Sequence, residues 1–128
     1  MNNVPSPLPK TSDEWLEHDI KRAGADKAPR ITPADVEANI ASEHYFTALD
    51  GVLTGAPIDN ATADSLRCLT FCVLVLRNGF TVTGESACAS PANFNAEIGR
   101  KIARENAINK VWPLMGYELR CRLAAGEV

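Results

Sequence analysis

Several features that mark common classes of protein are missing from this sequence. No apolar run approaches the roughly eighteen residues that a membrane-spanning helix needs. The N-terminus carries Pro5, Pro7 and Pro9 and lacks the charged-then-apolar pattern of a secretory signal. The 13 basic and 16 acidic side chains give a net charge of −3, which argues against sequence-independent binding to nucleic acid. We therefore expect a cytoplasmic protein that contacts neither membrane nor nucleic acid.

Cysteine and histidine are scarce as well. The two histidines are His18 and His44, and none of the four cysteines belongs to a C-x-x-C pair. We interpret these cysteines as reduced thiols that pack as small apolar groups. There is no Walker loop and no G-x-G-x-x-G run. The sequence thus predicts neither a metal site nor a cofactor.

The clearest local signal is a β-hairpin. Residues 69–76 form a short apolar run rich in β-branched side chains, which is typical of a buried strand. Asn78-Gly79 is a strong two-residue turn signal, and residues 80–85 alternate between apolar and polar side chains. A two-residue turn would place Val75 opposite Val82.

That register assigns each side chain to one face of the hairpin. The face that we expect to receive a helix consists of Val73, Val75, Phe80 and Val82. The other face carries Leu74 and Leu76 and is too apolar for water. It therefore needs a second cover, which is either an N-terminal helix or a partner chain.

A long helix is predicted after the hairpin. Ser90-Pro91 places a capping hydroxyl before a proline at the first helical position. Pro113 removes a backbone donor, so we expect a kink or break there and a shorter helix beyond it. Ala103 and Ala107 allow close approach on a second side. The expected buried arc consists of Phe94, Ile98, Ile102, Ile108 and Trp112.

The first half of the chain is less regular. We predict a flexible N-terminal segment over 1–30, containing a short helix that starts near Thr11, and a single domain over 31–126. A second helix is expected over roughly 33–42, a strand over 44–49 and a loop over 50–65. The fold class is therefore α+β. A small antiparallel hairpin or three-stranded sheet packs against a long, Pro-kinked C-terminal helix, with one or two short N-terminal helices.

The small residues 84–91, which join the second strand to the helix, form the first candidate site. Helix N-termini present free N–H groups to anions. The residues predicted to bind an anionic ligand are Glu85, Ser86, Ser90, Arg100, Lys101 and Arg104. The simpler interpretation, a capped connection with no ligand, is the better supported of the two by local sequence.

Two further candidates are a nucleophile and a pair of aromatic residues. Cys88 or Ser86 would need His44 as its base, but surface histidines are commoner than catalytic ones, so we do not predict an enzyme. Trp15 lies on a short helix in front of a linker, which suits docking on another surface. Tyr117 is the second residue predicted to stack or to contact a partner.

Several short runs together resemble one protein family. They are residues 69–74, 78–80, 84–87, 91–94, 98–99, 102–103, 106–107, 110–114 and 116–117, including Gly84-Glu85-Ser86-Ala87 and Lys110-Val111-Trp112. Over residues 31–123 the chain resembles an uncharacterised family of tailed-phage and prophage proteins, named after gene forty-nine and gene sixty-six of two enterobacterial phages. The resemblance implies a phage gene product in the cytoplasm of a bacterial host, and it carries over no activity and no catalytic residue.

Three functional hypotheses follow. The leading one is a phage accessory protein that binds without catalysis and modulates a host process such as antiphage defence. Its target would be a host protein or a small anionic, nucleotide-like signal. The alternative is a structural or regulatory protein that acts as a homo-oligomer, because the apolar hairpin needs more cover than one helix supplies. A small hydrolase built on Cys88 or Ser86 ranks third.

Overall fold

A computed structural model describes residues 8–53 and 55–128 of the chain. The prediction for residues 1–7 lies outside that range. The elements in chain order are α1 (Ser12–Arg22), α2 (Pro33–Ala38), β1 (Ile40–Thr47), α3 (Ala48–Val52), α4 (Asn60–Arg67), β2 (Leu69–Leu76), β3 (Thr81–Ala87), the 3-10 turn η1 (Pro91–Asn93) and α5 (Ala96–Ala124).

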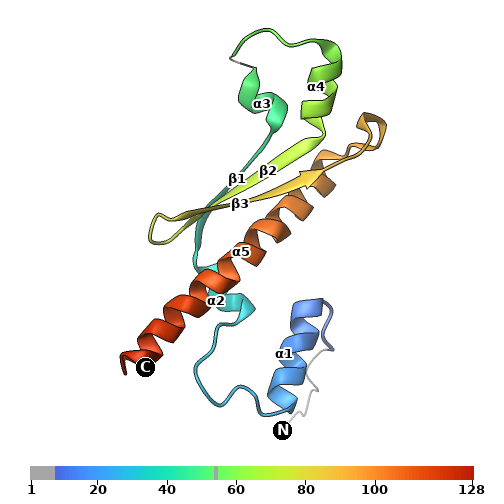
Figure 1. The fold of residues 1–128 in the computed structure, drawn as a ribbon. Helices are drawn as coiled ribbons and strands as arrows, with labels where there is room; N and C mark the ends of the chain where they lie inside the picture. Colours follow the sequence, from blue (N-terminus) through green and yellow to red (C-terminus); the bar gives the residue numbers. More distant parts are fainter. Residues whose placement is uncertain (1–7, 54) are drawn as a thin grey trace.

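The strands form one antiparallel sheet in the order β1-β2-β3. The long helix α5 lies along one face of this sheet, while α3 and α4 sit beyond one end of it (Figure 1). The predicted α+β fold, with a small sheet, a long C-terminal helix and short N-terminal helices, is confirmed.

The hairpin between β2 and β3 differs from the prediction in its turn. The Leu76 N–H donates to the Phe80 carbonyl, and the Gly79 N–H donates to the Leu76 carbonyl, so the loop holds three residues, 77–79. Gly79 has φ of +88°, the left-handed conformation that a three-residue loop of this kind requires. The extra residue shifts the register by one, so Leu74, not Val75, lies opposite Val82.

The one-residue shift moves every side chain of β2 to the other face. The face packed against α5 therefore carries the buried Cys72, Leu74 and Leu76. The expectation that Val73 and Val75 would receive the helix is wrong. These two residues and Phe71 lie half-buried on the opposite face of the sheet.

The long helix also begins later than predicted. Ser90 caps only η1 and makes no side-chain capping bond, whereas the Asn95 side chain accepts a hydrogen bond from the Ile98 N–H at the start of α5. Pro113 lies inside α5 and kinks it without ending it. The separate shorter helix expected after Pro113 is absent from the described part of the chain, because α5 continues to Ala124.

Of the side chains predicted for the buried side of α5, Ile108 and Trp112 pack partly buried against the core. The fully buried positions of the helix are instead Gly99, Ala103, Ala107, Val111 and Leu119. Ala103 and Ala107 have no exposed surface, whereas Ile98 is 57% exposed and Ile102 is also exposed. Gly84 of β3 explains why alanines, and not larger residues, face the sheet at this point. A Cβ atom there would lie 2.1 Å from the Ala103 carbonyl oxygen, so the backbones of helix and strand are in direct contact.

Side-chain caps stabilise the N-termini of the short helices in the first half of the domain. Thr32 and Asp35 form a capping box at α2, and Thr47 and Asp50 form another at α3. The predicted helix over 33–42 ends at Ala38, because β1 already begins at Ile40. The predicted loop over 50–65 contains the end of α3 and the start of α4. In the N-terminal segment, Glu17 of α1 forms an ion pair with Arg30, which lies just before α2.

Candidate functional site

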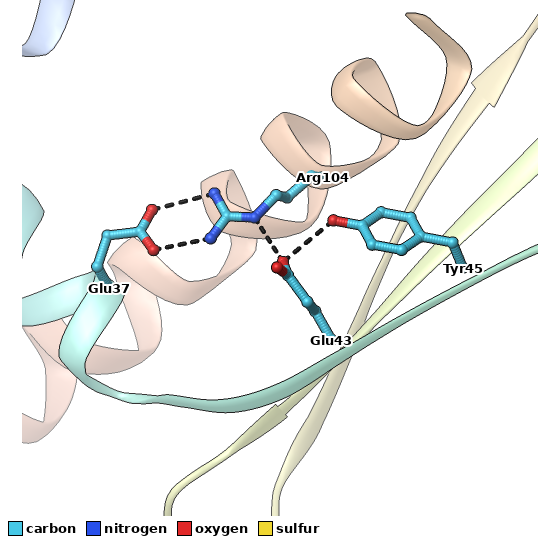
Figure 2. Close-up of polar contacts among 4 residues, drawn as sticks. All are labelled: Glu37, Glu43, Tyr45 and Arg104. Atoms are coloured by element: carbon cyan, nitrogen blue, oxygen red, sulfur yellow. Dashed lines mark hydrogen bonds and ion pairs between the residues drawn. The ribbon is translucent and has the colours of Figure 1, made fainter. Parts of the chain in front are cut away.

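Arg104 is the most completely paired side chain that the sequence singled out. Its Nη1 and Nη2 atoms donate to the two oxygens of Glu37 at 3.0 and 2.7 Å, and its Nε atom donates to Glu43 at 2.6 Å. The Tyr45 hydroxyl donates to the same Glu43 carboxylate at 3.0 Å. Figure 2 shows the guanidinium of α5 held between α2 and β1.

The pKa shifts in this cluster have clear causes. The hydrogen bond from Arg104 lowers the pKa of Glu43, more than partial burial raises it. Burial, followed by the bond to Glu43, raises the pKa of Tyr45. The hydrogen bond to Glu37 raises the pKa of Arg104. Arg104 therefore joins three elements of the fold, and its donors are engaged within the chain.

The structure does not bring the predicted anion-binding set together. Glu85 and Ser86 are consecutive residues of β3, so Ser86 faces α5 while the Glu85 side chain points to the opposite face. Ser90 precedes η1, which is three residues long and presents no extended helix terminus. Lys101 is exposed on α5. The ligand role of these residues stays a prediction.

Arg100, a member of that set, lines a cavity. The cavity has a volume of about 120 Å³ and lies between β1, the start of β2 and the first turn of α5. Its lining residues are Tyr45, Phe46, Thr47, Asp50, Thr70, Phe94, Ala96 and Arg100. We call it the Thr70 cavity, because Thr70 is 3% exposed and its hydroxyl has no hydrogen-bond partner among the described residues.

The residues proposed for nucleophilic catalysis are not assembled. His44 lies opposite Val73 and Ser86 lies opposite Thr70, so the two side chains are on opposite faces of the sheet and on its two edge strands. The Cys88 thiol donates to the Ser90 carbonyl at 3.1 Å, and the His44 ring contacts the Ser42 hydroxyl at 3.1 Å. No hydrogen bond joins His44 to either nucleophile in the described part of the chain.

Both aromatic residues chosen for partner contact are exposed. Trp15 packs edge-on against His18 on α1, with ring centroids 5.8 Å apart. Tyr117 is 74% exposed on the second half of α5. The two residues lie on separate elements, and their role in contacting a partner stays a prediction.

A larger groove, which the sequence did not indicate, lies between the hairpin loop, α2 and the C-terminal half of α5. Its volume is about 890 Å³. Leu76, Leu119 and Met115 contribute apolar surface to it, while Phe80 and Leu114 are 55% and 40% exposed. We call this feature the hairpin groove. It shares no lining residue with the Thr70 cavity.

The described residues were also compared with the requirements of a metal site and of a membrane-spanning helix. Within residues 8–53 and 55–128, no group of three or more His, Cys, Asp or Glu side chains is placed to hold a metal ion. Over the same ranges, no helix is both long enough and apolar enough to cross a membrane.

Comparison with known proteins identifies the family. The model of the Phage protein (N4 Gp49/phage Sf6 gene 66) family matches residues 31–123, which is more than half of the chain. The chain belongs to this family. The match covers every element from α2 to nearly the end of α5, and it leaves α1 outside. No curated protein and no solved structure matches the chain.

Sequence reasoning missed the residues that make the two concavities. Thr70 is a polar residue inside an apolar strand, and that interruption is the one local signal that could have identified it. Leu114 follows Pro113 on a helix whose buried side was misassigned, so its exposure at the hairpin groove could not be foreseen.

Proposed function

We propose that this family member is a non-enzymatic phage accessory protein that binds a host protein through the hairpin groove and thereby modulates a host process such as antiphage defence, in the host cytoplasm. One observation carries the proposal. A concavity of about 890 Å³, lined largely by apolar side chains, remains open on the described part of the chain.

The side chains around the groove favour an apolar protein segment over a charged small molecule. Arg30 pairs with Glu17, Asp35 belongs to the α2 capping box, and Arg122 Nε lies 2.7 Å from Glu118 Oε1. Most charges at the rim are thus already compensated. The floor of the groove is apolar, and the exposed side chains of Phe80 and Leu114 lie at its edge. Such a surface suits the insertion of apolar anchor residues from a partner protein.

The nucleotide version of the binding hypothesis receives less support. Arg104 is engaged with Glu37 and Glu43, and Ser86 and Ser90 do not flank the start of α5. The Thr70 cavity, at about 120 Å³, is smaller than the roughly 300 Å³ from which pockets for drug-sized ligands begin. A protein target is therefore the better supported form of the hypothesis.

The test is affinity capture from bacterial host lysate with a matched pair of variants. Leu114→Glu places a charge in the hairpin groove, whereas Ile98→Glu places the same charge on an exposed position of the same helix outside it. We expect wild type and Ile98→Glu to retain the same host protein and Leu114→Glu to lose at least about tenfold in affinity, as for a charge buried in an apolar contact. Equal capture by both variants, or no partner for wild type, would refute the proposal.

A second candidate, homo-oligomerisation, is favoured by one further observation. Phe71, Val73 and Val75 lie on the sheet face away from α5, where Phe46 stacks on Phe71 with centroids 5.3 Å apart. A second copy could cover this surface. Val73→Lys should then convert an oligomer to a monomer in light scattering, and a wild-type monomer at high concentration would remove this candidate.

A further inference from the structure

We propose that the Thr70 cavity binds a small oxyanion, a phosphate or carboxylate group held by the Arg100 guanidinium, the Thr70 hydroxyl and the first turn of α5. This site is independent of the hairpin groove and shares no lining residue with it.

Thr70 provides the first argument. It lies on the central strand β2 and faces α5, and a Cβ atom added to Gly99 would lie 2.8 Å from its Oγ1 atom. The residue is 3% exposed, yet the hydroxyl has no partner among the described residues. A buried hydroxyl without a partner costs free energy, and such groups normally have a hydrogen-bond partner. An anion in the adjoining cavity would accept that hydrogen bond.

Arg100 provides the second argument, by contrast with Arg104 one turn later on α5. Arg104 has two carboxylates, Glu37 and Glu43, within hydrogen-bond distance. No ion pair is formed by Arg100 with any residue of the described ranges, although its side chain lines the cavity. A bound oxyanion would give Arg100 the counter-charge that the chain gives to Arg104.

The end of the helix adds to the positive potential. Ala96, the first residue of the 29-residue helix α5, lines the cavity. The Asn95 side chain accepts only the Ile98 N–H of the first turn, so the helix retains free amide donors and the positive end of its dipole there.

Other polar groups at the cavity limit what it can hold. Asp50 is the acidic residue in the lining, and one of its oxygens accepts the Thr47 N–H at 2.9 Å. The Tyr45 hydroxyl is engaged with Glu43. The lining thus contains one negative charge, on Asp50, and two sources of positive potential, Arg100 and the start of α5. This small positive excess favours a single anionic group over a multiply charged ligand such as a polyphosphate.

Volume sets the size of the ligand. About 120 Å³ corresponds to roughly four water molecules, since each occupies about 30 Å³ of liquid. Inorganic phosphate or acetate fits within that space, and a whole nucleotide does not. A larger molecule could enter only by its anionic head group.

The experiment is titration of the full chain with inorganic phosphate, acetate and O-phosphoserine, followed by ¹⁵N NMR at ionic strength held constant with sodium chloride. Binding of phosphate and acetate but not O-phosphoserine would identify a free anion as the ligand. Binding of all three would identify an anionic head group. In either case we expect saturable changes in the backbone amide chemical shifts of Thr70 and Arg100, with a Kd below about 10 mM.

Three variants separate ligand binding from fold. Thr70→Val has the same shape without the hydroxyl, and Arg100→Gln removes the charge. Each should weaken phosphate binding by about tenfold. Lys110→Gln removes an equal charge from an exposed position of α5 outside the cavity and should leave the affinity unchanged.

Thr70→Val also controls for folding, because replacing an unpartnered buried hydroxyl by a methyl group should leave Tm equal or higher. No saturable binding of phosphate or acetate by wild type would overturn the proposal. So would an affinity that Thr70→Val and Arg100→Gln leave unchanged, or one that Lys110→Gln lowers as much as Arg100→Gln.

Discussion

Replacing Gly84 by alanine should be the most disruptive single-methyl change in this domain. The new Cβ would lie 2.1 Å from the Ala103 carbonyl oxygen and 2.3 Å from the Ala107 amide nitrogen. Both are backbone atoms of α5, so neither can rotate away as the end of a flexible side chain would. The helix as a whole must therefore move outward from the sheet.

The size of the effect follows from that displacement. Ordinary contacts of a Cβ atom begin near 3.4 Å, so α5 has to withdraw by about 1 Å along the part that covers Cys72, Leu74 and Val82. Overpacking of a rigid core costs about 1–3 kcal/mol, and a clash with two backbone atoms belongs at the upper end. A loss of about 3 kcal/mol lowers Tm by about 12 °C or more in a domain of this size.

Thermal unfolding followed by circular dichroism measures the change, and Gly116 supplies the control. Gly116 lies in α5 with no atom within 4 Å of the position of an added Cβ. Gly116→Ala should therefore raise stability by about 0.5–1 kcal/mol through helix propensity alone. A Gly84→Ala protein with wild-type Tm would show that the close approach of α5 to β3 is not what holds the two together.

Two other predictions concern charge and helix geometry. Because its pKa is lowered in the folded state, Glu43 contributes stability above its usual value of 4.5, and this contribution is lost as pH falls through the folded-state pKa. Glu43→Gln should thus lower Tm at pH 7, and its difference from wild type should shrink towards pH 3; a constant difference would contradict the assigned cause. Pro113→Ala restores one helix hydrogen bond and should raise stability by up to about 3 kcal/mol in denaturant titration, whereas an unchanged midpoint would mean that the kink is needed elsewhere.

The hairpin shows how far local sequence determines this fold. Asn78-Gly79 located the turn and both strands, and the apolar run identified β2 as a strand buried by its neighbours. The predicted pairing of β2 with β3 is wrong by one residue, because Gly79 takes the left-handed position of a three-residue loop and not the second position of a two-residue turn. Both loops use the same residue pair, so local sequence cannot separate them.

The buried side of α5 was misassigned for a related reason. Ile98 and Ile102 have the larger side chains, and burial of large apolar residues is the usual expectation. Here the sheet lacks a side chain at Gly84, so the helix approaches through Ala103 and Ala107. A glycine in one element and alanines in another form a contact that becomes recognisable only when the two are placed together.

The candidate sites depend even more on tertiary structure. Arg104 looked available for a ligand, yet its partners Glu37 and Glu43 lie 67 and 61 residues earlier in the chain. Thr70 is one polar residue in an apolar strand, and only the position of α5 leaves its hydroxyl buried beside a cavity. The charge and type of each residue can be read from the sequence, but which side chains form hydrogen bonds or ion pairs with one another cannot.

The strand order β1-β2-β3 has a consequence for how the chain reaches this fold. The central strand β2 is joined to β3 by the three-residue loop 77–79, whereas β1 is separated from β2 by residues 48–68. Closing the shorter loop costs less chain entropy, so the hairpin should form first, with α5 joining it next. During synthesis β1 leaves the ribosome before either of its eventual neighbours exists. Until β2 follows, its backbone donors and acceptors have no strand to pair with, and this interval is when the nascent domain is most exposed to wrong pairing.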